Sequence, residues 1–328
     1  MIDLMNIQEN KVTNNLNQYP IILTSLSGDG KTTTMKKIAE ELSNDGRKPL
    51  FIMFEDRYQH IPGIMAVRIH NMGELSMVQS QLMNPALKEK FSCVVFDTVD
   101  RLDSMIEKNV ADSKGVQISG DLGYGKGNKY IKSTAQFIYV IKDLGWTTHF
   151  IVQMNENKDI NTGAVTYEPK VNKEIWNMIY QDCYLCGFLK VGSKGERTLT
   201  FKKSSEFPKL KDSIGLPKDI KIDEFKKVFE KAVTEMAGGQ LTDEDTISVE
   251  YKDTRNFDEI KKRGMELGNI LAQKGFLNEA TFILAQTIGV DENEKPKSFD
   301  SLIPAQVDIA DVCVQKLEDL AKQKGIEI

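Results

Sequence analysis

The stretch Ser25-Leu26-Ser27-Gly28-Asp29-Gly30-Lys31-Thr32 decides how this chain is expected to fold. It follows the apolar run 19–24 and precedes a helical pattern, so a strand, a loop and a helix come in the order that a phosphate-binding loop requires. Small residues let consecutive backbone N–H groups turn toward phosphate oxygens, and the helix adds the positive end of its dipole. The stretch therefore predicts a site for a nucleoside triphosphate.

Individual positions in this stretch have predicted roles. Lys31 is expected to reach the β- and γ-phosphates, and Thr32 to hold Mg²⁺. The residues predicted to bind ATP are Ser27, Gly28, Asp29, Gly30, Lys31, Thr32 and Thr33. Ser25 departs from the usual pattern G-x-x-x-x-G-K-[ST], so the turn into the loop is expected to lack a residue that freely accepts positive φ. The alternative is a Gly-rich turn before an ordinary helix.

The composition is ordinary for a globular protein of 328 residues, with 40% hydrophobic and 28% charged side chains. No run approaches the roughly 20 apolar residues of a membrane span, and residues 1–19 are too polar for a secretory signal, so we expect a cytoplasmic protein. The net charge of −5 means that any contact with a polyanion must come from local basic segments. The four cysteines, with Cys183 and Cys186 among them, are expected to be packed thiols.

Buried strands alternate with helical patterns through the first two thirds of the chain. The strand-like apolar runs are 49–54, 91–96 and 148–152, and the helical patterns are 33–44, 75–82 and 130–144. Near-continuous apolar strands joined by helices indicate a mainly parallel sheet that is covered on both faces. Two later strands, 183–190 and 197–203, are expected to close the sheet as an antiparallel hairpin. The predicted fold class is α/β, with a P-loop NTPase core.

The pattern changes near the C-terminus. A Gly-Gly pair and the acidic run 242–245 indicate a linker, and only helices are expected beyond Arg255, at 257–274, 277–288 and 303–324 with a polar loop at 291–297. We therefore expect an ATPase core over 1–238, a linker over 239–254 and a small helical domain over 255–328.

Three polar side chains end predicted buried strands. Asp97 is the predicted Mg²⁺ carboxylate, a role compatible with capping the next helix. Glu55 is the predicted hydrolytic base, because a strand beside the phosphate loop would hold it near the attacking water. Asp56 or a solvated acidic turn is the alternative there. Gln153 is placed to hydrogen-bond the γ-phosphate and to report its loss, with plain structural polarity as the alternative.

Two polar segments carry features of nucleic-acid binding. Residues 154–173 are predicted to form a long polar loop, and residues 112–130 a Gly-rich one. Glycines let a loop extend and adapt, lysines bind phosphates, and tyrosines offer stacking surfaces for unpaired bases. The residues predicted to bind DNA are Lys126, Lys129, Lys158, Tyr167, Lys170 and Lys173. A mobile surface loop is the alternative for 112–130, where Tyr124 is also a candidate for contacting the nucleotide.

Basic residues gather in and after the last predicted strand, at Lys202, Lys203, Lys209 and Lys211. On a monomer they form a solvated basic face. In a head-to-tail oligomer they would reach the γ-phosphate of the neighbouring subunit, where charge supplied in trans stabilises the transition state. Both interpretations stay open at this point.

Together these residues resemble the RecA-type recombinase ATPases, and among them the compact phage AAA nucleotide-binding proteins used in single-strand annealing and recombination. The resemblance spans roughly residues 18 to 220 and rests on the stretches 27–33, 51–55, 94–98, 120–127 and 144–153. It implies a RecA-like core, a DNA loop at 154–173, and Lys202 or Lys203 acting in trans. Two positions depart from the pattern: Ser25 replaces the first Gly, and Gln153 stands where many phage relatives carry His.

The resemblance also implies partners and an activity. We expect a DNA-dependent ATPase that assembles head to tail, as a ring or a filament, on single-stranded DNA, in the cytoplasm of a bacterial host if a phage encodes it. It would hydrolyse ATP at the subunit interface and promote annealing or recombination. The C-terminal helices are similar to small modules of phage recombination proteins, which implies a partner such as a single-strand-binding protein.

Two other functions remain open from the sequence. One is a P-loop ATPase switch or loader for DNA replication. Within that class, Leu26 argues against a partition ATPase, because such proteins carry Lys at this position. The other is an ATP-gated DNA-binding scaffold with little turnover, which the replacement of Gly by Ser25 favours.

Overall fold

The computed structural model describes residues 11–56, 58–238, 240–242, 256–291, 295–303 and 306–326. The chain divides into two compact units, Met1–Glu250 and Tyr251–Ile328. Most of the predicted linker 239–254 lies outside the described residues. Its described part belongs to the first unit, because β12 (Leu241–Thr242) pairs in parallel with β1 (Val12–Thr13).

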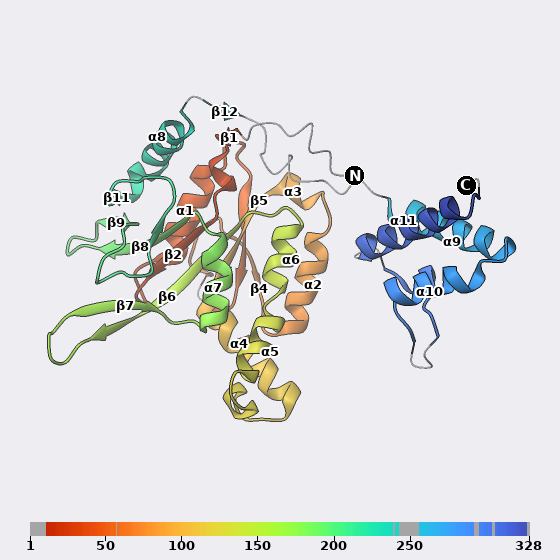
Figure 1. Ribbon diagram of the computed structural model, residues 1–328. Coiled ribbons are helices and arrows are strands. Elements are labelled where there is room, and N and C mark those ends of the chain that lie inside the picture. The colour runs from red at the N-terminus through yellow and green to blue at the C-terminus, as the bar shows by residue number, and fades with distance from the viewer. Residues whose placement is uncertain are drawn as a thin grey trace. The chain divides into compact units, whose positions relative to one another are not determined.

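A ten-stranded sheet forms the centre of the first unit (Figure 1). Its strands are β2 (Ile21–Ser25), β3 (Lys48–Met53), β4 (Met65–Arg68), β5 (Phe91–Asp97), β6 (Thr148–Lys158), β7 (Val165–Pro169), β8 (Leu185–Val191), β9 (Arg197–Thr200), β10 (Lys211–Asp212) and β11 (Asp219–Lys221). The order along the main path is β11-β9-β8-β2-β6-β5-β3-β4. The neighbours from β8 to β4 are parallel, whereas β9, β10 and β11 pair antiparallel, which confirms the predicted sheet type and closing hairpin.

Helices cover both faces of this sheet. They are α1 (Lys31–Leu42), α2 (Met72–Leu82), α3 (Leu87–Lys90), α4 (Val99–Lys114), α5 (Lys126–Thr134), α6 (Phe137–Asp143), α7 (Lys173–Asp182) and α8 (Phe225–Ala237). One apolar cluster packs the sheet against α1 and α8, and the other packs it against α2, α4, α6 and α7.

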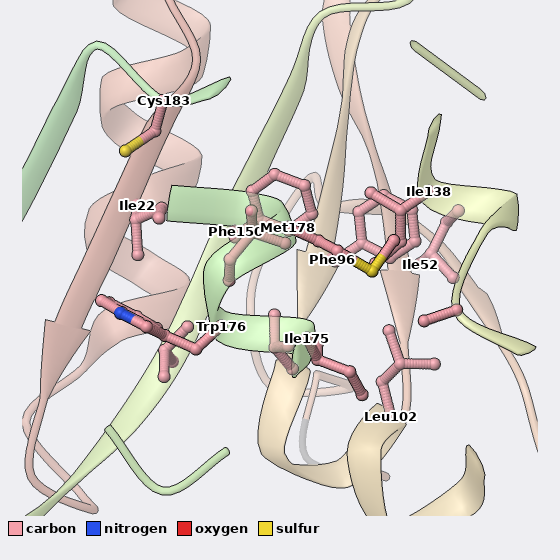
Figure 2. Packing of buried hydrophobic residues seen from close by; sticks show 14 of the residues in the cluster. Ile22, Ile52, Phe96, Leu102, Ile138, Phe150, Ile175, Trp176, Met178 and Cys183 are labelled. Carbon is pink, nitrogen blue, oxygen red and sulfur yellow. The ribbon is translucent and has the colours of Figure 1, made fainter. Parts of the chain in front are cut away.

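The strand β5 shows how one sequence fills both clusters. Side chains alternate across a strand, so Cys93 and Val95 enter the cluster under α1 while Val94 and Phe96 enter the other. Figure 2 shows the second cluster, where Phe96 stacks on Phe150 of β6 with ring centroids 5.3 Å apart. Every residue of β5 is buried, so the packed core fixes the position of its last residue, Asp97, at the edge of the sheet.

Several predicted elements differ from the structure. The predicted loop 154–173 is wrong, because β6 continues to Lys158 and pairs with β7 as an antiparallel hairpin. Asp159 Oδ1 accepts hydrogen bonds from the backbone of residues 161 and 162, and Gly163 adopts φ 69°, so the polar residues form a compact turn. Figure 1 shows this hairpin projecting beyond the sheet.

Two further predictions need correction. The predicted helix 130–144 is two helices, α5 and α6, and the predicted Gly-rich loop 112–130 contains the end of α4, a 3₁₀ turn (Ser119–Leu122) and the start of α5. Strand β4 was not predicted, because its four residues are only half-buried and the apolar run that includes them, 64–67, is short. All four cysteines are free and buried, which confirms that they are packed thiols.

The second unit is helical in its described residues, with α9 (Phe257–Gln273), α10 (Leu277–Thr287) and α11 (Val307–Gln323). Its own apolar core includes Leu267, Leu271 and Leu317. The last helix begins at Val307 rather than at 303, after a 3₁₀ turn at Phe299–Ser301. In the parts of the chain with described coordinates, no helix has the length and apolar character needed to cross a membrane.

Candidate functional site

The phosphate loop, residues 26–30, joins the buried strand β2 to the first turn of α1. Gly28 and Gly30 adopt φ of 91° and 82°, a conformation that side chains with a Cβ rarely adopt. Ser25 is the last residue of β2 and pairs in register with Gln153 of β6. The departure from Gly at position 25 therefore puts no strain on the turn, because Gly28 and Gly30 provide the left-handed residues.

Lys31 lies under this loop and is only 8% exposed. Its Nζ donates to the backbone oxygens of Leu26 at 2.6 Å and Ser25 at 3.4 Å. Burial lowers the pKa of Lys31, while the charges of Asp100 and Asp29 oppose that effect. The ammonium group is therefore held within the loop, in the position from which a P-loop lysine reaches phosphate oxygens.

Asp97 lies at the end of β5, beside the first turn of α1. Its Oδ2 accepts a hydrogen bond of 2.6 Å from Thr32 Oγ1, and the residue is 2% exposed. Burial raises the pKa of Asp97 to about 7, although the bond from Thr32 opposes the shift. A hydroxyl and a carboxylate in contact are hard oxygen donors of the kind that Mg²⁺ prefers, so Thr32 and Asp97 fit the ion that accompanies a bound nucleotide.

Glu55 follows β3, which is not the neighbour of the phosphate-loop strand. The sheet order places β6 and β5 between β2 and β3, so the predicted strand adjacency is wrong. Glu55 nevertheless lies near the site, because its charge contributes to the pKa values of both Lys31 and Asp97. Its Oε1 accepts from Arg101 Nε at 3.0 Å. The neighbouring Asp56 pairs instead with Arg68.

Gln153 lies inside β6 rather than at its end, beside the phosphate loop. Its backbone N–H donates to Asp100 Oδ1 at 3.3 Å. Asp100, in the first turn of α4, is 6% exposed and was not singled out in the sequence. The available signal was its position three residues after Asp97, which places the two carboxylates on either side of the junction between β5 and α4. The structure thus brings Lys31, Thr32, Asp97, Glu55 and Gln153 to one edge of the sheet.

The lysines predicted to act in trans contact groups of their own chain. Lys202 Nζ pairs with Asp212 Oδ2 at 2.8 Å, and the Asp212 side chain is 5% exposed. Lys203 lies near the Tyr180 hydroxyl, whose pKa its charge lowers against the effect of burial. Lys211 Nζ donates to the backbone oxygens of Tyr180 and Gln181. A role in trans for Lys202 or Lys203 remains a prediction. It requires the side chain to leave its partner in the same chain and to bind the neighbouring subunit.

The segments predicted to bind DNA lie side by side. Asn172 Nδ2, at the start of α7, donates to Asn128 Oδ1 of α5 at 3.2 Å. Exposed lysines flank both asparagines: Lys126 and Lys129 on one segment, Lys170 and Lys173 on the other. We call these four lysines the basic surface. Lys158 is also exposed, at the far end of β6.

Tyr167 does not lie free on the hairpin. Its ring stacks on Phe207 with centroids 5.1 Å apart and contacts Phe188, and its hydroxyl donates to Glu156. These contacts occupy the ring that was predicted to stack on bases. Tyr124, by contrast, is fully exposed.

The chain is similar to known proteins over most of its length. Residues 17–209, more than half of the chain, match a family described as AAA domain. Over 336 aligned residues the chain is 23% identical to the SPbeta prophage-derived uncharacterized protein YorG of Bacillus subtilis strain 168, and the alignment covers 97% of this chain and 98% of that protein.

Proposed function

Because the chain belongs to the AAA domain family and is a P-loop ATPase, we propose that it is a DNA-dependent one, which binds single-stranded DNA and promotes annealing or recombination. Mg²⁺ would be held by Thr32 and Asp97 beside the nucleotide. The observation that carries the proposal is the bond between Asn128 and Asn172, which unites two lysine-bearing segments into one basic surface. Lysines gathered on one surface are suited to a phosphate backbone.

The helix α4 supports the proposal, because it connects this surface to the nucleotide site. Asp103 Oδ2 accepts a 2.7 Å hydrogen bond from the backbone of Asn172, and Asp100, three residues earlier, accepts from Gln153. Residues three apart lie on the same side of a helix. A change at the terminal phosphate that moves Gln153 would therefore reach the basic surface through one rigid helix.

We also propose a head-to-tail oligomer with ATP at the subunit interface, in which Lys202 or Lys203 acts in trans. Both side chains are exposed and follow the closing strand β9. The second unit would recruit a protein partner such as a single-strand-binding protein. Exposed apolar side chains on its helices, including Leu277, Phe282 and Val312, support a docking role.

The decisive experiment measures ATP hydrolysis and DNA binding together, over a series of salt concentrations. Single-stranded DNA should stimulate hydrolysis in the wild type. The double variants Lys126→Ala/Lys129→Ala and Lys170→Ala/Lys173→Ala should weaken DNA binding and flatten the slope of log affinity against log salt by about 0.7 for each lost phosphate contact.

A matched control removes two lysines from α8, on the other face of the sheet. Lys227→Ala/Lys231→Ala changes the net charge equally and should leave the slope unchanged. If DNA neither binds nor stimulates hydrolysis, the DNA proposal fails, and a P-loop ATPase that acts as a switch or loader becomes the better interpretation. If DNA binds but turnover stays absent with and without it, the protein acts as an ATP-gated scaffold.

A further inference from the structure

Arg197, the first residue of β9, lies directly against the phosphate loop of its own chain. Its Nε donates to the backbone oxygen of Asp29 at 3.4 Å. A Cβ built on Gly30 would lie 2.7 Å from one terminal nitrogen of the guanidinium and 3.2 Å from its central carbon. The guanidinium therefore occupies the space that a side chain at position 30 would fill.

Among the described residues, no Asp or Glu forms an ion pair with the guanidinium of Arg197, whereas Lys37 on α1 pairs with Asp223. A guanidinium carries five N–H donors in a planar fork, and the bond to Asp29 uses one of them. The remaining donors lie beside backbone N–H groups that are themselves suited to phosphate oxygens.

A cavity of about 310 Å³ opens next to the guanidinium, along the side of α1. Its lining includes Thr33, Thr34, Lys37, Arg197, Lys221 and Ile222, together with the acidic Glu196 and Asp223. Thr33 belongs to the first turn of α1, so the cavity begins where the phosphate loop ends. The Asp223 carboxylate is paired with Lys37, and the hydroxyls and other cations on the walls suit the polar parts of a nucleotide.

We propose that Arg197 binds the α- and β-phosphates of the nucleotide held by its own chain, and that the cavity along α1 receives the nucleoside. Asp97 and Glu55 mark the end of the site where the terminal phosphate reacts, whereas Arg197 lies over Asp29 and Gly30, whose N–H groups cradle the inner phosphates. Arginine is suited to this role because its fork can donate two parallel hydrogen bonds to a phosphate. The inference requires the nucleotide binding of the family and is independent of the DNA proposal.

Titration of the full chain with fluorescent analogues of ATP and ADP tests the inference. Arg197→Ala should weaken the binding of both nucleotides by a similar factor of about tenfold or more, as expected when a charged hydrogen-bonding partner is lost. Arg197→Lys should recover only part of the affinity, because an ammonium group keeps the positive charge but cannot donate two parallel hydrogen bonds to one phosphate. The KM for ATP should rise while kcat stays near that of the wild type.

Lys194→Ala is the matched control, since it removes one positive charge from the turn that precedes β9. Its affinities should equal those of the wild type. Unchanged nucleotide affinity in Arg197→Ala would overturn the inference. A loss of affinity confined to ATP would also overturn it, because that result would place the arginine at the γ-phosphate. An equal loss of affinity in Lys194→Ala would overturn it as well, because the effect would then come from the net positive charge of the region and not from Arg197. Thermal unfolding of each variant separates a binding defect from misfolding.

Discussion

Thr32 and Asp97 are joined by a hydrogen bond of 2.6 Å between Oγ1 and Oδ2, although 65 positions separate them in the chain. Thr32 lies in the first turn of α1 and Asp97 ends β5, and the strand β6 lies between β5 and the phosphate-loop strand β2. The bond therefore spans an intervening strand at the sheet edge. It fixes a hydroxyl and a carboxylate at the place where the Mg²⁺ of a bound nucleotide needs oxygen ligands.

Asp97→Asn should stabilise the protein without nucleotide while it removes Mg²⁺-dependent hydrolysis. Burial raises the folded-state pKa of Asp97 to about 7 from 3.8, so the folded state holds the proton more tightly than the unfolded state. The stability of the wild type therefore falls as pH rises from about 4 to about 7. Above that range the free-energy cost of burying the charged carboxylate is fully present. A shift of this size is worth on the order of 4 kcal/mol.

Urea unfolding at pH 5.5 and at pH 8, without nucleotide, checks this prediction. The advantage of Asp97→Asn over the wild type should be larger at pH 8, because the asparagine carries no charge to bury. An advantage that does not grow with pH would show that the carboxylate is solvated in solution.

Glu55→Gln should lower kcat while leaving the KM for ATP near the wild-type value. The amide keeps the shape of the side chain but cannot take a proton from water, and general-base catalysis typically contributes about 10²–10⁴-fold. The matched variant is Asp56→Asn, whose carboxylate is exposed and pairs with Arg68. Steady-state hydrolysis of both variants assigns the base: if Asp56→Asn loses the activity and Glu55→Gln keeps it, the assignment of Glu55 is wrong.

Asp103→Ala should reduce the stimulation of hydrolysis by single-stranded DNA while basal hydrolysis persists. The variant removes the acceptor that holds the Asn172 backbone to α4, so the basic surface loses its attachment to the helix that also holds Gln153. Asp103→Asn retains an acceptor oxygen and should keep most of the stimulation. The measurement is the ratio of turnover with and without DNA, and an equal ratio in all three proteins would mean that α4 does not carry the signal.

The sequence was most informative where a function depends on neighbouring residues. The phosphate loop and the strand that ends at Asp97 could be predicted because glycines, a lysine and unbroken apolar runs are local patterns. The hairpin of β6 and β7 was hidden because the outer half of β6, residues 155–158, is wholly polar, and the alternation in β7 extends over only a few residues. Arg197 lies 168 positions from the oxygen that it contacts, and nothing local identifies such a contact. The position of Glu55 required the strand order, which the sequence does not encode locally.

Gly187→Ala should destabilise the first unit and weaken nucleotide binding, although position 187 lies in the middle of β8. A Cβ there would lie 2.5 Å from Cε1 of Phe201, whose ring is buried and stacks on Phe225. Overpacking of this kind typically costs about 1–3 kcal/mol. Thr24 Oγ1 donates to the Gly187 backbone oxygen at 2.9 Å, so a shift of β8 displaces β2 just before the phosphate loop.

Urea unfolding and the KM for ATP measure the two effects of Gly187→Ala, with Gly120→Ala as the control because an added Cβ there meets only Ile118, at an ordinary 3.7 Å. Phe201→Leu in the Gly187→Ala background should restore part of the lost stability, since the smaller side chain makes room for the methyl group. Because the clash and the hydrogen bond act on the same strand, the KM should recover along with the stability. Recovery of stability alone would show that β8 and β2 move independently.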